Sequence, residues 1–129
     1  MKLFPADSAF SICIRTRDRW ACTRCHVTYP PPTQALHCMH WQGRGKWSVR
    51  FNPDNARAGC YGCHRYLDTH PYEKDRFFRL WLGDTRADEI VLLANKPSNG
   101  IKKELKLIAK HYRTQHERMQ DGHKLEAYA

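Results

Sequence analysis

Four cysteines in the first half of the chain have the spacing of metal ligands. They form two Cys-x-x-Cys pairs, Cys22 with Cys25 and Cys60 with Cys63, separated by 34 residues. Two such pairs can place four thiolates at tetrahedral corners around one zinc ion. The long spacer leaves room for a β-hairpin, so we predict a structural Zn²⁺ that ties the ends of the hairpin together and contributes to folding. The alternative is that these cysteines are redox-active dithiols or unrelated thiols.

Three further residues have the chemistry needed to hydrolyse a phosphodiester bond. Such hydrolysis needs an activated water molecule and neutralisation of the phosphate charge, which a histidine base and a divalent cation can supply. His40 is the candidate general base, and Asn55 is expected to hydrogen-bond across the hairpin and fix the orientation of that base. His64 directly follows Cys63, so we expect it to be held rigidly as a ligand of the catalytic cation.

The composition indicates a polyanionic partner. The net charge is +9 and the isoelectric point is about 9.5. A small protein this basic is expected to bind nucleic acid. Basic residues near the predicted site can contact phosphates, which gives affinity without sequence specificity. The predicted DNA-binding residues are Arg24, Arg44, Lys46, Arg50 and Arg57.

The order of these residues resembles that of a known nuclease family. Asn55 followed by Cys60-Tyr61-Gly62-Cys63-His64 is similar to the Asn-x4-Cys-x2-Cys-His ending of the HNH (His-Me finger) endonucleases, in which His40 would be the first histidine. Over residues 8–83 the chain resembles most closely the phage recombination proteins of the NinG type. The shared motifs are Phe10-Ser11-x-x-Ile14-Arg15-x-Arg17-Asp18, His40 with the following aromatic residue, Arg44-Gly45, Arg50-Phe51, Tyr72 and Leu82-Gly83. The resemblance implies a ββα-metal finger that cuts or binds branched DNA during recombination.

The chain departs from the HNH pattern at Met39. In that family the residue before the catalytic histidine is usually an aspartate that binds the metal, and a thioether is a poor ligand for magnesium. A second protein ligand must then come from elsewhere, and His37 and His70 are the nearest candidates in the sequence. We expect the catalytic cation to be Mg²⁺, Mn²⁺ or Ni²⁺. A histidine-rich site would favour manganese, nickel or zinc over magnesium.

The elements that position these residues indicate an α+β fold. The sequence predicts helices over 7–19, 71–82, 85–95 and 101–120, and strands over 33–41 and 47–51. We expect helix 71–82 to be well buried and Thr85 with Asp88 to form a capping box. The apolar face of the last helix is expected to pack on helix 71–82 or to mediate a dimer. We divide the chain into an HNH core with an N-terminal helix, 1–83, and a basic helical extension, 84–129.

The sequence also indicates where the protein is located and which partners it has. None of the 129 residues lies in an apolar run long enough to span a bilayer or in a signal-peptide pattern, so we expect a cytoplasmic protein, in the host cell if the chain is phage-encoded. DNA, possibly branched, is the expected partner rather than a membrane, and a resolvase would require a homodimer. The main alternative is a non-catalytic zinc module that binds DNA as a recombination accessory. An RNA-binding zinc protein is a third reading.

Overall fold

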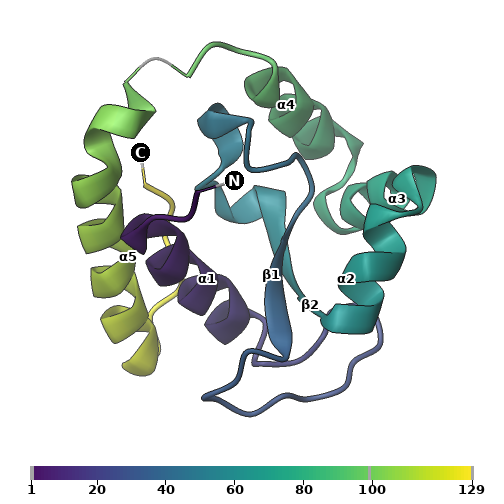
Figure 1. Cartoon of the computed structure of the whole chain (residues 1–129), viewed down its shortest axis with the longest axis horizontal. Helices are drawn as coiled ribbons and strands as arrows, with labels where there is room; N and C mark the ends of the chain where they lie inside the picture. Colours follow the sequence, from purple (N-terminus) through teal and green to yellow (C-terminus); the bar gives the residue numbers. More distant parts are fainter. Residues whose placement is uncertain (1, 99, 129) are drawn as a thin grey trace.

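Residues 2–98 and 100–128 are described by a computed structural model and form a mixed α+β fold (Figure 1). The elements in chain order are α1 (Pro5–Arg17), β1 (Leu36–His40), η1 (Trp47–Val49), η2 (Pro53–Asn55), β2 (Ala56–Cys60), α2 (Tyr61–Asp68), α3 (Pro71–Leu82), α4 (Asp84–Ala94), η3 (Ile101–Glu104) and α5 (Leu105–Gln120). Figure 1 shows the strands in the middle, with α1 and α5 on one side and α2 and α3 on the other.

Helix α1 begins two residues earlier than the sequence predicts. Pro5 occupies the first helical position, where its fixed φ suits a helix and its missing N–H costs nothing. The Asp7 carboxylate accepts a hydrogen bond of 2.8 Å from the backbone N–H of Phe4 and so caps the first turn. Arg19 and Trp20 then adopt positive φ angles, which end the helix. The predicted N-terminal helix is therefore confirmed with slightly shifted ends.

The hairpin exists, but its second strand lies further along the chain than expected. Strand β1 pairs antiparallel with β2 in a register that runs from Leu36 opposite Cys60 to His40 opposite Ala56. The prediction of a strand over 47–51 is wrong, because Trp47–Val49 forms a 3-10 turn. Its alternating apolar residues do not share one sheet face. Val49 packs in the cluster around Trp41 and Phe78, whereas Phe51 packs in the cluster around α1.

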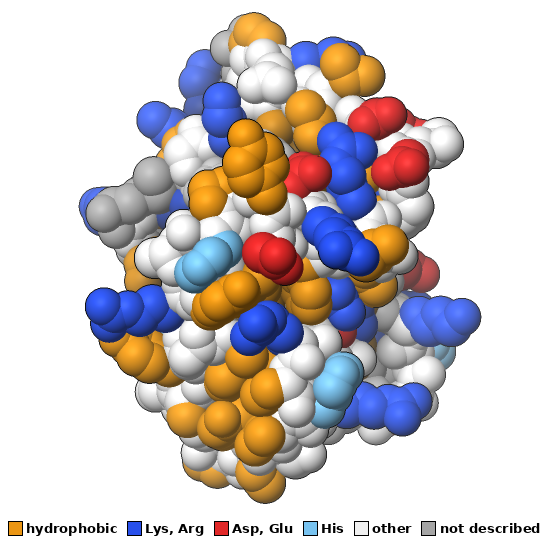
Figure 2. Space-filling view, turned by 90° about the vertical axis from the view of Figure 1, so that its right-hand side faces the viewer, with side chains coloured by type: hydrophobic (Ala, Val, Ile, Leu, Met, Phe, Trp, Pro, Cys, Tyr) orange, Lys and Arg blue, Asp and Glu red, His pale blue; other side chains and the backbone are white. Residues whose placement is uncertain are grey.

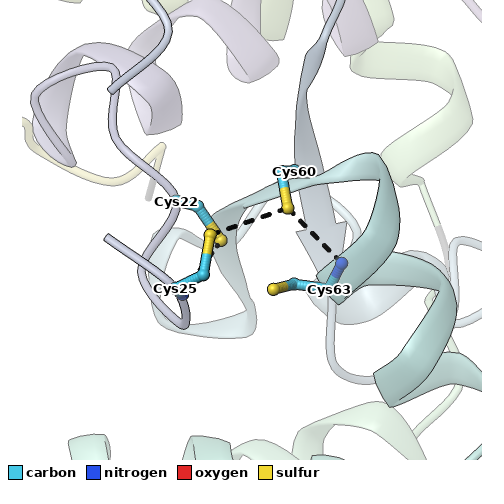
Figure 3. Close-up of side chains that lie close together, drawn as sticks. All are labelled: Cys22, Cys25, Cys60 and Cys63. Atoms are coloured by element: carbon cyan, nitrogen blue, oxygen red, sulfur yellow. Dashed lines mark hydrogen bonds between the residues drawn. The ribbon is translucent and has the colours of Figure 1, made fainter. Parts of the chain in front are cut away.

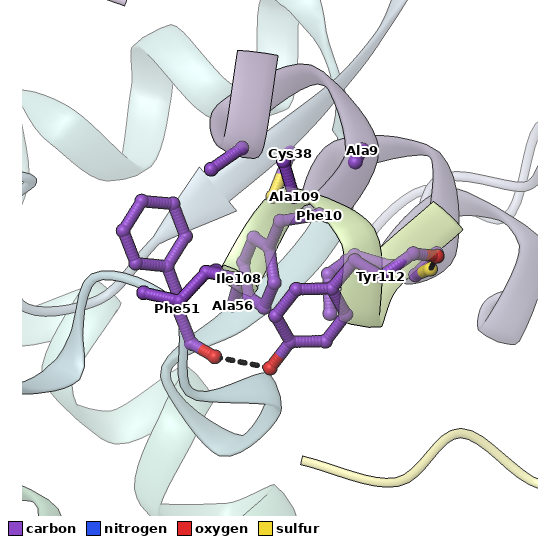
Figure 4. Close-up of a cluster of buried hydrophobic side chains, with 11 residues drawn as sticks. Ala9, Phe10, Cys38, Phe51, Ala56, Ile108, Ala109 and Tyr112 are labelled. Carbon is purple, nitrogen blue, oxygen red and sulfur yellow. Dashed lines mark hydrogen bonds between the residues drawn. The ribbon is translucent and has the colours of Figure 1, made fainter. Parts of the chain in front are cut away.

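The largest core lies between α1 and α5. Phe10 and Ile14 of α1 pack with Ile108 and Tyr112 of α5. The hydroxyl of Tyr112 donates a hydrogen bond to the backbone oxygen of Phe51 (Figure 4). The expectation that the last helix packs on helix 71–82 is therefore wrong, since its apolar face covers α1 instead. This core joins segments from both sides of the predicted boundary at residue 83, and the division into two domains stays a prediction.

Helix α3 has the predicted bounds but not the predicted burial. Phe78 is its buried residue and stacks on Trp41 with ring centroids 5.6 Å apart. Tyr72 and Leu80 are 93% and 75% exposed, because α3 packs on its neighbours along one side only. The prediction that α3 is well buried is wrong. The predicted capping box of α4 is also absent, since α4 starts at Asp84 and places Thr85 inside its first turn.

The structure contains no candidate for a membrane-spanning element within the described residues. None of the helices there is both long enough and apolar enough to cross a bilayer.

Candidate metal centre and histidine pocket

The two Cys-x-x-Cys pairs converge on one point. The sulfur atoms of Cys22, Cys25, Cys60 and Cys63 all lie within 4.8 Å of one another, and none of them forms a disulfide. Figure 3 shows them approaching from the loop after α1 and from the junction of β2 with α2. A zinc–sulfur bond of about 2.3 Å in a tetrahedron separates the sulfurs by about 3.8 Å. The Cys25–Cys60 separation is 3.8 Å, so this cluster could hold a structural metal such as zinc.

The local backbone points an N–H group at the sulfur of the first cysteine of each pair. The N–H of Cys25 donates to the Cys22 sulfur at 3.5 Å, and the N–H of Cys63 donates to the Cys60 sulfur at 3.4 Å. Burial raises the pKa of Cys22, but the backbone N–H groups that point at its sulfur outweigh burial and lower the pKa to about 7. A thiolate is the form that binds a metal, so this environment favours coordination.

Arg24 lies against the cysteine cluster. Its Nη1 is 3.4 Å from the Cys63 sulfur, and its guanidinium stacks 4.2 Å from the centroid of the Tyr66 ring. A positive charge here would offset the negative charge of four thiolates around one divalent ion. The predicted contact of Arg24 with DNA stays a prediction, and the structure gives the side chain a second role.

His40, at the end of β1, is held as a neutral base. Its Nε2 lies 2.9 Å from the backbone oxygen of Arg50. A carbonyl oxygen only accepts, so Nε2 must carry the hydrogen, and the lone pair of the neutral ring then sits on Nδ1. Burial lowers the pKa of His40 to about 4. The ring is therefore neutral at physiological pH and able to accept a proton at Nδ1.

Asn55 fixes the loop that follows His40. Its side-chain oxygen accepts from the Gln42 N–H at 2.8 Å, and its amide donates to the backbone oxygens of Gln42 and Val49 at 2.9 and 3.2 Å. Asn55 is fully buried. It therefore acts on the loop that supplies the hydrogen-bond partner of His40 and has no surface to offer a substrate.

Arg50 anchors the same loop from the other side. Its Nε and Nη2 donate to the two carboxylate oxygens of Asp7 at 2.9 and 2.8 Å. Arg50 has no exposed surface. The prediction that Arg50 binds DNA is wrong, because its guanidinium is committed to this buried ion pair. Its backbone oxygen faces His40, so the pair ties the orientation of His40 to the first turn of α1.

His64, in the first turn of α2, contacts a partner at each ring nitrogen. Its Nδ1 is 3.0 Å from Nδ1 of His37, and its Nε2 is 3.2 Å from the carboxylate of Asp68, one helical turn later. Burial lowers the pKa of His64, which favours the neutral form of its ring. The other carboxylate oxygen of Asp68 is 2.6 Å from Nζ of Lys74.

These side chains surround a pocket of about 310 Å³, the His40 pocket. Its lining residues are Cys38, His40, Gly43, Arg44, His64, Asp68 and Lys74. Cys38, Arg44 and His64 also line a neighbouring pocket of about 360 Å³ between α1 and β1, the α1 pocket. Arg44 is the cation shared by both. Its Nε is buried and has no hydrogen-bond partner among the described residues.

The other predicted site residues lie elsewhere. His70 lines neither pocket, since its ring stacks on Tyr66 and its Nδ1 is 2.7 Å from the Tyr66 backbone oxygen, so the structure does not unite it with His64. Met39 is fully buried. The Arg57 guanidinium lies between the rings of Phe77 and Trp81, at 4.3 and 4.6 Å from their centroids. Lys46 is exposed, and its contact with DNA stays a prediction.

Asp68 and Lys74 are site residues that the sequence analysis did not find. Asp68 follows His64 by four residues, which places both side chains on one face of a helix. That spacing was a usable signal once residues 61–68 were known to be helical. Lys74 carries no such signal, because it comes from the next helix and reaches Asp68 only through the turn between α2 and α3.

Comparison of the chain with models of protein families, with curated proteins and with solved structures found no match.

Proposed function

We propose that the chain is a metal-dependent endonuclease of the HNH type that hydrolyses phosphodiester bonds in DNA. The observation that carries this proposal is the content of the His40 pocket. A neutral histidine with its lone pair on Nδ1 lines the same pocket as His64, Asp68 and Arg44. The resemblance of the sequence to HNH endonucleases supports the same conclusion.

Each residue of the pocket has a defined part in this proposal. His64 and Asp68 would hold the divalent cation, which when bound polarises the phosphate and stabilises the leaving oxygen. Nδ1 of His40 accepts the proton of the attacking water molecule. Arg44 binds a non-bridging phosphate oxygen. His37 contacts the other nitrogen of the His64 ring and orients it.

The four cysteines hold a structural Zn²⁺ in the proposed enzyme. Their donor set is complete with four thiolates, which is the usual composition of closed structural zinc sites. Cys60 ends β2 and Cys63 lies in the first turn of α2. The zinc therefore fixes the start of the helix that carries His64 and Asp68.

The test is cleavage of labelled linear duplex, flap and four-way DNA with magnesium, manganese, nickel or no added metal. Wild type is compared with His40→Ala, and both are checked for zinc content and DNA affinity. We expect the wild type to cut and the folded variant to bind without cutting. A His70→Ala variant, which removes an imidazole outside both pockets, serves as the matched control and should cut like the wild type.

Met39 favours a second candidate function, a non-catalytic zinc module that binds DNA in recombination. The buried thioether cannot supply the carboxylate that the HNH pattern places beside the catalytic histidine. Binding of DNA by wild type and His40→Ala alike, with no cleavage under any metal, would overturn catalysis in favour of this accessory function. The ranking of flap, four-way and linear substrates distinguishes branched-DNA processing from general nuclease activity.

A further inference from the structure

A basic groove lies between the N-terminal segment and the η3–α5 region, away from the His40 pocket. It has a volume of about 800 Å³ and is lined by Phe4, Pro5, Lys102, Lys103, Leu105, Lys106, Ala109 and Arg113. The floor is apolar, and every ionisable side chain in the lining is a cation. The groove therefore combines positive potential with apolar surface.

The cations of this groove are not neutralised by the protein. Lys103, Lys106 and Arg113 are exposed and form no ion pair within the described residues. Lys102 contacts the Trp47 ring, 5.1 Å from its centroid. The nearby carboxylate of Glu104 instead accepts a hydrogen bond from the Tyr128 hydroxyl.

The opposite face of the molecule shows the contrast. On α3 and α4, Arg79 pairs with Asp75 and Asp88, and Arg86 pairs with Glu89 as well as with Asp54. Figure 2 shows acidic and basic side chains next to one another on the face with α3 and α4. The groove thus gathers several cations that are unpaired among the described residues, whereas Arg79 and Arg86 on the α3–α4 face are paired with carboxylates.

The basic groove and the α1 pocket are lined by neighbouring residues of the N-terminal segment. Phe4 and Pro5 line the groove, whereas Leu3 and Asp7 line the α1 pocket, so both depressions border on the same N-terminal segment. The α1 pocket in turn shares Arg44 and His64 with the His40 pocket. A long polyanion bound at His40 can therefore continue along α1 and reach the groove.

We propose that the basic groove binds the phosphate backbone of duplex DNA that flanks the cut site. This inference rests on the proposed function and extends its substrate contact beyond the predicted DNA-binding residues. Lys106 and Arg113 are seven residues apart on α5, which corresponds to about 10 Å along the helix. That separation is larger than the rise of about 3.4 Å per phosphate along the axis of one DNA strand, so the two side chains can contact different phosphates.

The test is equilibrium binding of a fluorescent DNA duplex, without divalent cation so that no cleavage occurs, at several salt concentrations. The groove variant replaces four cations with glutamine: Lys102→Gln, Lys103→Gln, Lys106→Gln and Arg113→Gln. We expect its affinity near 0.1 M salt to fall about tenfold or more, and the slope of log affinity against log salt to decrease by about 3. Thermal unfolding checks that both proteins remain folded.

The matched control removes the same amount of charge from exposed positions outside the groove. It carries Arg76→Gln, Lys96→Gln, Arg118→Gln and Lys124→Gln. Equal affinity and equal salt slope of the groove and control variants would overturn the proposal. So would a loss of affinity for duplex RNA that leaves duplex DNA binding unchanged. Should the fourfold groove variant unfold, Lys106→Glu alone must still weaken DNA binding more than Lys124→Glu does.

Failure of this inference can be told apart from failure of the proposed function. If the wild type does not cut DNA with any of the metals but the groove variant binds DNA poorly, the groove proposal is supported and the nuclease proposal is overturned. If the groove variant cuts and binds DNA like the control variant, the groove proposal is overturned and the nuclease proposal is unaffected. In a working nuclease, we expect the groove variant to raise KM at unchanged kcat, because it lacks binding but not catalytic groups.

Discussion

The cysteine cluster and the His40 pocket share helix α2, yet they offer a metal ion opposite environments. The cluster presents four sulfur atoms within 4.8 Å of one another and leaves no ligand position for water. The His40 pocket presents one imidazole and one carboxylate beside a space of about 310 Å³. Closed donor sets are typical of structural metals, and incomplete ones leave positions for substrate and water.

The difference shows how one short helix can serve both purposes. Cys63 and His64 are adjacent in the sequence, so a metal bound by the four cysteines would fix both the first turn of α2 and the proposed catalytic ligand. In the proposed enzyme, the cysteine site would supply rigidity and the His40 pocket would supply the catalytic groups. Changes in the two sites should therefore have different readouts, stability for the first and activity for the second.

The largest expected effect is the loss of stability on changing the cysteine cluster. Cys60→Ser removes a ligand of the proposed zinc, whose binding contributes about 10 kcal/mol or more in small zinc domains. That exceeds or equals the total stability of most domains, roughly 5–15 kcal/mol. We expect the variant to lose its zinc and most of its helical circular dichroism. Cys38→Ala, at a buried thiol outside the cluster, should keep one zinc per chain. A folded Cys60→Ser protein with full zinc content would contradict the proposal that the four cysteines together bind one structural zinc.

The next largest effect is expected at the His40 pocket, on activity and not on folding. His40→Ala removes the proposed base, and we expect kcat to fall about 10²- to 10⁴-fold. Zinc content should not change, because His40 is not near the cysteine cluster. A variant that retains the activity of the wild type would show that another group activates the water molecule.

The pH dependence of stability separates the two sites further. The folded pKa of His40 is about 4, below its ordinary value of 6.5, because burial disfavours the charged ring. The stability that this neutral ring contributes is complete above pH 6.5 and is lost as the pH falls through 6.5 toward 4. The loss amounts to about 3 kcal/mol.

Denaturant unfolding of wild type and His40→Gln between pH 4 and 7, without added divalent cation, measures this contribution. Acid release of zinc affects both proteins, so the difference between them isolates His40. Parallel stability curves across this range would show that the His40 ring is not held neutral by burial.

A smaller effect is expected at Asp68. Asp68→Asn removes a charged ligand of the proposed cation but keeps the size of the side chain. We expect the metal concentration for half-maximal cleavage to rise about 10- to 100-fold. Asp75→Asn, which changes a carboxylate paired with Arg79 on α3, is the control and should not alter the metal requirement. If the two variants behave alike, Asp68 does not bind the cation.

The sequence predicted correctly those elements whose ends are marked by residues within the element or next to it. Pro71 and Gly83 bound α3 as expected, and the two cysteine pairs do converge. The second strand was missed because Ala56–Cys60 contains alanine, glycine and cysteine instead of β-branched residues. The partner of α5 was missed because an amphipathic pattern shows that a helix packs, but not on what. The buried state of Arg50 depends on its contact with Asp7, which lies far away in the sequence, and no local pattern reveals it. Asp68 was missed because residues 61–68 were not predicted to be a regular helix.

Gly59 couples two positions of the hairpin. A side-chain carbon built at residue 59 would lie 2.3 Å from the Met39 sulfur, so the methionine occupies the space that any other residue at 59 would need. An aspartate at 39 would place an unpaired carboxylate at a fully buried position beside an empty volume. A side chain at position 59 therefore requires Met39 to move or to be replaced by a smaller residue. A single mutation to the acidic residue of the HNH pattern would cost stability before it could contribute a ligand.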